Sequence, residues 1–324
     1  MSFKSIERIK TLNNPEHLEF EEVSCYMCGS DESEEFLVGE EDLTGKDGEF
    51  LYVKCKECSL VYQNPRIPIT GIKEYYDSEY IAHRKKKDWG ILTPLYEWAM
   101  GKHDRDKLKL VKRFVTLNQK TKLLDVGCAV GTFLLHANNK YKCHISGVDF
   151  KEDLDFPGFD RVEFFEGLFY DQTMEKENYD VITMWHFLEH CYDPNKSLQK
   201  AKEVLKKDGK LVIEVPRLDS FTFKLFGKKW PGVQAPQHTT MFDKKRFIKI
   251  IEQNGFKVEK YMAYGAFPPY FYIFTGTYFK LFGKGLNLNK IIFPYFLFQF
   301  LLFPILLFKN YLNLSMQTIV CKKL

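Results

Sequence analysis

The stretch that decides the fold is Leu-Leu-Asp-Val-Gly-Cys-Ala-Val-Gly-Thr-Phe-Leu, which occupies residues 123–134. Its apolar start predicts a buried strand, its glycines predict a tight turn, and its end predicts a helix. A second apolar strand follows at residues 145–148 and ends on Asp149, 24 positions after Asp125. A strand, a glycine loop, a helix, a strand and an acid in this order hold the ribose end of a nucleoside cofactor.

The spacing of the glycines indicates which cofactor this is. A dinucleotide site uses G-x-G-x-x-G, so that the backbone can approach a pyrophosphate. Here only Gly127 and Gly131 remain, because Ala129 and Thr132 occupy the second and third glycine positions. This spacing favours a ligand without phosphate and argues against NAD and FAD.

Residues 122–216 resemble the core of a class I S-adenosylmethionine-dependent methyltransferase. Asp125, Gly127 and Gly131 match the first motif of that family, Asp149 matches the acid that binds the ribose hydroxyls, and residues 179–186 match the fourth strand. The resemblance implies an α/β, Rossmann-like, seven-stranded sheet with S-adenosylmethionine as its cofactor. The expected cofactor-binding residues are Asp125, Gly127, Cys128, Gly131, Asp149, Trp185 and His186. The alternative is an ordinary βαβ unit with an incidental glycine turn.

The pattern around this loop alternates between strands and helices, which predicts a parallel sheet with right-handed crossovers. The last two strands are expected at residues 256–264 and 316–321, as an antiparallel hairpin with a long insert between them. The predicted strands of the parallel part are 122–126, 144–149, 161–165, 179–184 and 210–215, and the predicted helices are 131–139, 194–206 and 243–254.

The chain of 324 residues divides into four expected regions. A lead and a zinc ribbon occupy residues 1–65, and a helical linker or substrate cap occupies residues 66–120. The methyltransferase domain comprises residues 121–264 and 315–324. An apolar helical hairpin, residues 265–314, is inserted before the last strand.

The cysteines are concentrated near the N-terminus, in two C-x-x-C pairs. Two thiolate pairs on tight turns supply four soft ligands in a tetrahedral arrangement, which suits zinc. Because all four ligands come from the protein, the predicted role of the metal is structural. The alternatives are metal-free knuckles or a redox C-x-x-C. The expected ligands are Cys25, Cys28, Cys55 and Cys58.

The order of the regions sharpens the resemblance. A zinc ribbon, then Asn-Pro-Arg at residues 64–66, then a methyltransferase core resembles bacterial enzymes that methylate sugars in polysaccharide and antibiotic pathways. These relatives include the nucleotide-sugar C-methyltransferases. The resemblance implies that a tyrosine after the ribbon contributes to the active site, and Tyr75, Tyr76 and Tyr80 are the candidates.

Polar residues follow the fourth predicted strand. Trp-His-Phe-Leu-Glu-His at residues 185–190 falls at the carboxyl edge of the sheet, where open α/β folds bind ligands. We expect His186 near the cofactor, and we expect Glu189 and His190 to take part in acid–base catalysis on the substrate side. The alternative is that Glu189 and His190 cap and orient the following helix.

A further histidine, His238, lies in Gln-Ala-Pro-Gln-His-Thr-Thr at residues 234–240, a composition typical of a substrate loop. The resembled sugar methyltransferases have a Glu-His or similar pair here, whereas this chain has Gln237 before the histidine. Loss of the carboxylate puts a carbon-acid mechanism in doubt and leaves His238 as the expected catalytic base. The alternative is a helix N-cap with an incidental histidine.

The C-terminal insert is apolar and basic. Residues 291–308 contain only the Gln299 amide and the Tyr295 hydroxyl as polar side-chain groups, and no Asp or Glu follows Glu259. The run is marginal for a membrane span and contains two prolines. We expect residues 266–313 to insert shallowly into an anionic membrane surface. The alternatives are a homo-oligomer interface and a soluble apolar layer.

Together these patterns predict methyl transfer from S-adenosylmethionine to a saccharide, either nucleotide-linked or lipid-linked. The alternatives are a quinone-like lipid acceptor, an RNA acceptor, and a non-catalytic membrane-associated scaffold.

The net charge of +4 gives no global nucleic-acid signature. A basic run at residues 83–87 is expected to be a solvated helix face or a contact to anionic groups. The first twenty residues lack an apolar run, so we expect a cytoplasmic protein, peripheral at the inner face of the membrane.

Overall fold

The computed structural model describes residues 4–43, 45–76, 93–150, 157–285, 294–301, 304 and 314–324. Tyr80 and the basic run at residues 83–87 lie outside the described residues.

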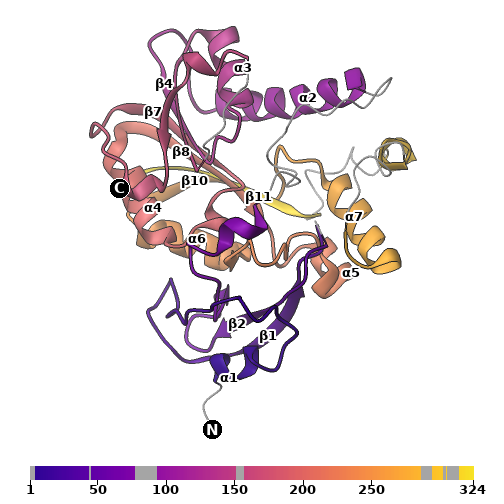
Figure 1. Ribbon diagram of the computed structural model, residues 1–324. Helices are drawn as coiled ribbons and strands as arrows, with labels where there is room; N and C mark the ends of the chain where they lie inside the picture. The colour runs from indigo at the N-terminus through magenta and orange to yellow at the C-terminus, as the bar shows by residue number, and fades with distance from the viewer. Residues whose placement is uncertain are drawn as a thin grey trace.

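A seven-stranded sheet forms the centre of the molecule (Figure 1). Its strand order is β10-β11-β8-β7-β4-β5-β6. The five strands from β8 to β6 are parallel, and β10 and β11 are antiparallel to their neighbours. This confirms the predicted methyltransferase-type sheet. The bounds are β4 (Lys122–Val126), β5 (His144–Asp149), β6 (Glu163–Glu166), β7 (Tyr179–Trp185), β8 (Leu205–Pro216), β10 (Phe256–Met262) and β11 (Met316–Lys323).

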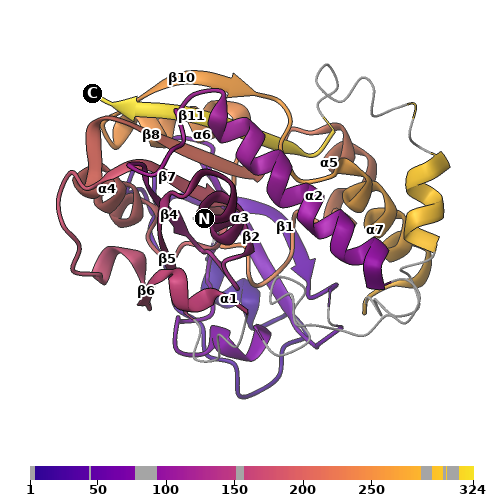
Figure 2. The ribbon, with the colours of Figure 1, turned by 90° about the horizontal axis from the view of Figure 1, so that it is seen from above.

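Helices cover both faces of this sheet, as a parallel sheet requires. On one face α2 and α3 bury Val111 and Leu134 against Leu123 of β4. On the other face α4 and α6 bury Leu198 and Phe247 in the cluster that contains Leu124. Figure 2 shows α2 beside α3 above the sheet. The bounds are α2 (Thr93–Lys112), α3 (Thr132–Tyr141), α4 (Pro194–Val204) and α6 (Lys244–Gln253).

Local capping explains where two of these helices begin. Asp193 accepts a hydrogen bond from the Lys196 amide at the start of α4, and Asp243 accepts one from the Arg246 amide at the start of α6. Such caps satisfy amides that have no partner within the helix. The predicted extension of α4 to residue 206 is wrong, because β8 begins at Leu205, and residues 206–209 form an irregularity within that strand.

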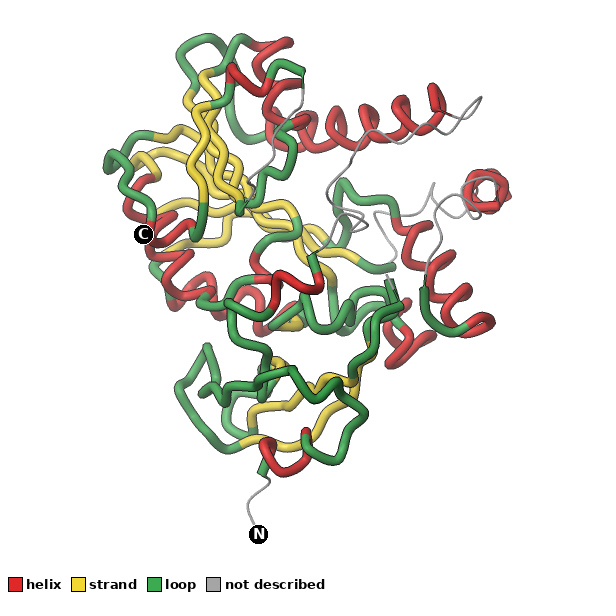
Figure 3. Tube along the Cα trace, in the orientation of Figure 1, coloured by secondary structure: helices red, strands yellow, loops and turns green. Residues whose placement is uncertain are grey.

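A second, four-stranded antiparallel sheet lies at the N-terminal end of the molecule (Figures 1 and 3). Three strands come from the ribbon, and β9 comes from the part of the chain that follows β8. The apolar cores are continuous, because Leu51 and Tyr62 of the ribbon share one buried cluster with Ile213 of β8. The bounds are α1 (Ser5–Ile9), β1 (Ser33–Glu40), β2 (Glu49–Cys55), β3 (Val61–Gln63) and β9 (Thr240–Met241).

The insert before β11 contains a helix, α7 (Pro269–Phe282), and a second helical segment at residues 294–301. The two segments pack together, because the Phe274 ring lies 5.5 Å from that of Tyr295 and 5.4 Å from that of Phe298. Within the described ranges, no helix is both long and apolar enough to cross a membrane. The short elements are η1 (Ile72–Tyr75), η4 (Phe159–Arg161), η5 (Phe169–Asp171), η6 (Leu188–His190), α5 (Phe221–Phe226) and η7 (Gly227–Lys229).

Candidate functional site

The four N-terminal cysteines converge on one point. The Sγ atoms of Cys25 and Cys58 are 3.4 Å apart, as are those of Cys28 and Cys55, and all four lie within 4.8 Å of one another. Four sulfurs about a zinc ion at 2.3 Å would be about 3.8 Å apart. The residues present therefore fit a closed zinc site with four thiolate ligands.

Two matching turns build this cluster. The Gly29 amide donates to the Cys25 carbonyl, and the Ser59 amide donates to the Cys55 carbonyl. Gly29 has φ +73° and Ser59 has φ +62°. Each of these residues has a left-handed backbone conformation and closes the turn after one cysteine pair. The two thiols of that pair then point to the same side, which explains the paired C-x-x-C spacing.

The glycine loop after β4 adopts the conformation that its sequence predicts. Gly127 has φ +75°, and a Cβ there would lie 2.9 Å from the Phe187 ring. Gly131 has φ +70° and immediately precedes α3. The Cys128 side chain is buried against β5, where a Cβ on Gly147 would lie 2.6 Å from its sulfur. Glycines are therefore required at three points where backbone and side chains approach closely.

Asp149, at the end of β5, faces this loop. Its carboxylate accepts hydrogen bonds from the amides of Ala129 and Phe150, each at 2.7 Å. A carboxylate has about four lone-pair positions, so two remain for further donors. The two hydroxyls of a ribose are donors of this kind, and the residues present therefore fit the nucleoside part of S-adenosylmethionine.

Asp125, at the carboxyl end of β4, is 3% exposed. It accepts a 2.6 Å hydrogen bond from the Thr183 hydroxyl. Burial raises the pKa of Asp125 to about 7, against the opposing effect of the Lys107 ammonium. Lys107 also lies 5.3 Å from the centre of the Trp185 ring. The predicted Trp185 therefore lies in the same neighbourhood as Asp125.

His186 follows β7 and lies between two carboxylates. Its Nδ1 is 3.5 Å from Glu189, and its Nε2 is 3.3 Å from Glu214. Burial alone would lower the pKa of His186, but the two carboxylates outweigh burial and raise this pKa to about 9. The imidazole is therefore positively charged at neutral pH.

Glu214 is a candidate site residue that the sequence alone did not indicate. Its carboxylate is fully buried and accepts hydrogen bonds from the amides of Ala266 and Phe267 and from the Thr318 hydroxyl. It therefore ties the start of the insert to the carboxyl edge of the sheet. An acid inside the apolar run 211–216 is the sequence signal that could have identified it.

The structure brings His190 and His238 together, although 48 positions separate them. Their ring centres are 4.5 Å apart, and one nitrogen of each lies within 4.8 Å of a Glu189 carboxylate oxygen. Burial lowers the pKa of both imidazoles. Both rings are therefore neutral at neutral pH. We call Glu189, His190 and His238 the acceptor cluster.

The tyrosine that accompanies this cluster is Tyr76. Its hydroxyl is 2.9 Å from Nδ1 of His190. Tyr75 instead donates its hydroxyl hydrogen to the Asp47 carbonyl. Among the described candidates, Tyr76 is therefore the one that reaches the cluster.

The helix-capping alternatives for these residues are wrong. The cap of α4 is Asp193, which leaves Glu189 and His190 outside that role. The cap of α6 is Asp243, and His238 precedes β9 instead of a helix. Buried side chains that do not cap helices remain available for chemistry.

Comparison with known proteins identifies this architecture. A family model described as a methyltransferase domain matches residues 100–261. The ubiquinone biosynthesis O-methyltransferase of Actinobacillus pleuropneumoniae serotype 7 is 32% identical over 145 residues, which cover 40% of this chain and 61% of that protein. An uncharacterized protein of Methanocaldococcus jannaschii is 29% identical over 87 residues, 27% of this chain and 42% of that protein. The match thus spans less than two thirds of either relative.

Among solved structures, the geranyl diphosphate C-methyltransferase from Streptomyces coelicolor superposes with a TM-score of 0.49. It is 10% identical in sequence, and the superposition covers 74% of this chain and 87% of that chain.

We predict that Asp149→Ala weakens S-adenosylmethionine binding at least about 100-fold, because hydrogen bonds to a charged group contribute about 1.5–3 kcal/mol each. Isothermal titration calorimetry with the cofactor measures this. Asp160→Ala removes the same charge from an exposed position and should bind like the wild type. Undiminished binding by Asp149→Ala would contradict the assignment.

We predict that Asp125 makes stability depend on pH. Its pKa is about 7 in the folded state and 3.8 ordinarily. Folding therefore favours the protonated form, and this stabilisation is lost as the pH rises through 7. Relative to Asp125→Asn, the free energy of unfolding of the wild type should fall by about 2 kcal/mol between about pH 5.5 and 8. Denaturant titrations measure this difference, and a constant difference would show that the pKa is not raised.

Proposed function

Because the chain belongs to the methyltransferase-domain family, we propose that it transfers the methyl group of S-adenosylmethionine to an oxygen or carbon of a small-molecule acceptor. The family match covers residues 100–261, which is half of the 324-residue chain. The predicted membership of the class I S-adenosylmethionine-dependent methyltransferases is thereby confirmed.

The observation that carries the proposal is the continuity of the carboxyl edge. Asp125 is the second-last residue of β4, which precedes the glycine loop, and Asp149 is the last residue of the neighbouring strand β5. Trp185 ends the neighbouring strand β7, and the chain runs from it through His186 to the acceptor cluster. The residues that we propose for the cofactor and those that we propose for the acceptor follow neighbouring strand ends, which supports direct transfer between two bound ligands.

The chemistry requires positioning and the removal of one proton. The sulfonium of the cofactor activates its methyl group, so an acceptor atom attacks the methyl carbon as the carbon–sulfur bond breaks. An acceptor hydroxyl or acidic carbon must lose its proton in this process. We assign this activation of the acceptor to Glu189, His190 and His238, and the positioning of His190 to Tyr76.

Two acceptor classes have support. Both oxygens of Glu189, Oε1 of Gln237 and Oγ1 of Thr240 are buried without a hydrogen-bond partner among the described residues. A hydroxyl-rich acceptor such as a saccharide, nucleotide-linked or lipid-linked, would satisfy such groups. The second candidate is a quinone-like lipid, favoured by the similarity to a ubiquinone biosynthesis O-methyltransferase.

We propose that the cysteine cluster holds a structural zinc ion. The donor set of four thiols and the two knuckles support this. The strand β2 that ends at Cys55 also carries Tyr52, whose hydroxyl donates to the carbonyl of His238 at 2.7 Å. Zinc would therefore stabilise a support of the acceptor cluster.

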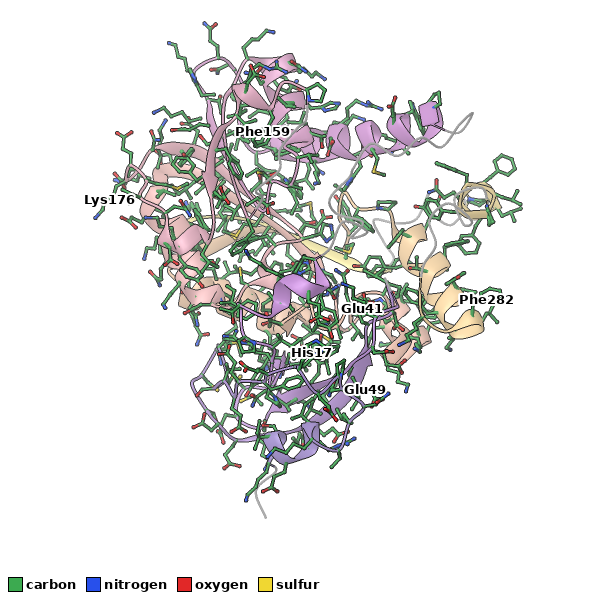
Figure 4. The ribbon with its side chains drawn as sticks, in the orientation of Figure 1. His17, Glu41, Glu49, Phe159, Lys176 and Phe282 are labelled. Carbon is green, nitrogen blue, oxygen red and sulfur yellow. The ribbon has the colours of Figure 1, made fainter. Side chains whose placement is uncertain are left out.

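We further propose that α5 and α7 attach the protein to an anionic membrane surface on the cytoplasmic side. The two helices pack together, because the Lys280 ammonium donates to the Leu225 carbonyl. Exposed apolar side chains lie on α5, on the end of α7 and on the helical segment at residues 294–301, and Figure 4 labels Phe282 at the outer end of α7. The apolar group is Phe221, Leu225, Leu281, Phe282, Leu297, Phe300 and Leu301, and the exposed lysines beside it are Lys224, Lys228, Lys280 and Lys284.

We predict that His238→Ala lowers methyl transfer at least about 100-fold, as the loss of an acid–base group does, without changing cofactor binding more than twofold. Formation of S-adenosylhomocysteine is measured with nucleotide sugars, a polyprenyl-linked sugar and a demethylated quinol. His144→Ala, exposed at the opposite end of β5, is the control. If the protein binds the cofactor but methylates none of these acceptors, the proposed acceptor classes are contradicted. Full activity of His238→Ala would remove this residue from the mechanism.

We predict that the double variant Leu281→Ser, Phe282→Ser floats with anionic liposomes at least about tenfold less than the wild type, because two apolar side chains lose burial. Leu324→Ser, equally exposed at the C-terminus, is the control and should float normally. Flotation assays with anionic and neutral vesicles measure this. If the wild type stays in solution, or forms dimers through this surface, membrane attachment is wrong.

A further inference from the structure

We propose that the acceptor cluster of Glu189, His190 and His238 binds a divalent transition-metal ion of the zinc class, in addition to the ion of the cysteine cluster. The binding of this ion is argued from the structure alone. Only the role of the ion in methyl transfer rests on the proposed function.

The first support is geometric. One donor atom from each of the three side chains lies within 4.8 Å of the other two. Ligand atoms around a zinc ion at about 2.1 Å are about 3.4 Å apart, so small side-chain rotations would close the site. The imidazole rings meet edge to face, with ring centres 4.5 Å apart and an angle of 78° between their planes.

The second support is the hydrogen bonding of the imidazoles. Nδ1 of His190 is 3.0 Å from the Gln237 carbonyl, and Nδ1 of His238 is 2.9 Å from the Gly232 carbonyl. A carbonyl oxygen only accepts hydrogen bonds, so the proton of each neutral ring belongs on Nδ1. The Tyr76 hydroxyl oxygen, 2.9 Å from Nδ1 of His190, then accepts from the same N–H group. The Nε2 lone pair is then the free donor of both rings. Metal-binding histidines are commonly held in this way, with the second nitrogen on a carbonyl.

The third support is the state of Glu189, which is 1% exposed. No described residue hydrogen-bonds to either of its oxygens, and His186 Nδ1 lies 3.5 Å away. Glu214, the other carboxylate beside His186, accepts three hydrogen bonds. Among the described residues, Glu189 therefore lacks the hydrogen-bond donors that satisfy Glu214. A buried carboxylate with so few partners is costly, and a cation at the cluster would compensate it.

The donor set indicates the kind of metal. Two imidazoles and one carboxylate suit zinc, iron(II) and cobalt(II), whereas magnesium and calcium prefer oxygen ligands. Three protein ligands leave at least one coordination position open. An acceptor hydroxyl bound there would have a lowered pKa and would release its proton to solvent before attacking the methyl group. In this arrangement the metal activates the acceptor, and His238 acts as a ligand.

The test is a titration of the full-length protein, purified with its cysteine-bound metal, with Co²⁺. We expect one further equivalent per chain, with visible d–d absorption and without the near-ultraviolet charge-transfer band of thiolate ligands. Glu189→Gln and His238→Ala should each lower the Co²⁺ affinity at least about 100-fold. Both variants should keep the cysteine-bound metal and the thermal unfolding midpoint, which excludes misfolding. His144→Ala should bind Co²⁺ like the wild type.

Each outcome decides the proposal. Absence of a further Co²⁺ equivalent overturns it, and so does Co²⁺ binding by Glu189→Gln with wild-type affinity, which would be adventitious. Methyl transfer that persists with only the cysteine-bound metal would refute the activating role of the second metal, but neither its binding nor the proposed function. Stoichiometric Co²⁺ binding by protein that does not bind S-adenosylmethionine would support the second metal site and contradict the proposed function.

Discussion

The acceptor cluster depends on the backbone of Thr239, which is hydrogen-bonded to both parts of the molecule. Its amide donates to the Glu189 carbonyl, and its carbonyl accepts from the Gln63 amide, each at 2.8 Å. Its hydroxyl donates to the Cys191 carbonyl. One residue therefore fixes the η6 loop, the ribbon strand β3 and the segment that carries His238. Because these bonds are buried, breaking any of them would leave an unsatisfied polar group.

This connection explains why the ribbon is part of the functional unit. The strand β9 pairs with β3 of the ribbon, and β9 begins two residues after His238. The Tyr52 hydroxyl donates to the carbonyls of both Val233 and His238. The ribbon thus positions the loop that carries a histidine of the cluster, and it does so through backbone contacts. A rigid support of this kind holds site residues more precisely than a free loop would.

The parts of the fold that were predictable are those with a local signature. The glycine loop, the strand that ends at Asp149 and the two knuckles each depend on residues a few positions apart. The pairing of β9 with β3 and the contact of Glu214 with His186 join segments far apart in sequence, and no local pattern encodes them. The start of β8 was predicted at residue 210 instead of 205 for the same reason, because the run Lys-Lys-Asp-Gly at residues 206–209 is typical of a strand boundary unless the pairing partner is known.

The carboxyl edge of the sheet is rich in acidic residues. Asp149 and Glu189 lie along it with the buried Asp125 and Glu214; Asp125 is partly protonated at neutral pH, because burial raises its pKa to about 7, and Glu214 faces the His186 imidazolium. Fixed carboxylates in a poorly solvated site favour cationic ligands. S-adenosylmethionine carries a sulfonium, whereas its product S-adenosylhomocysteine carries a neutral thioether. Methyl transfer therefore removes the positive charge that this edge attracts, and the same electrostatic field that favours cofactor binding also favours exchange of the product for a new cofactor.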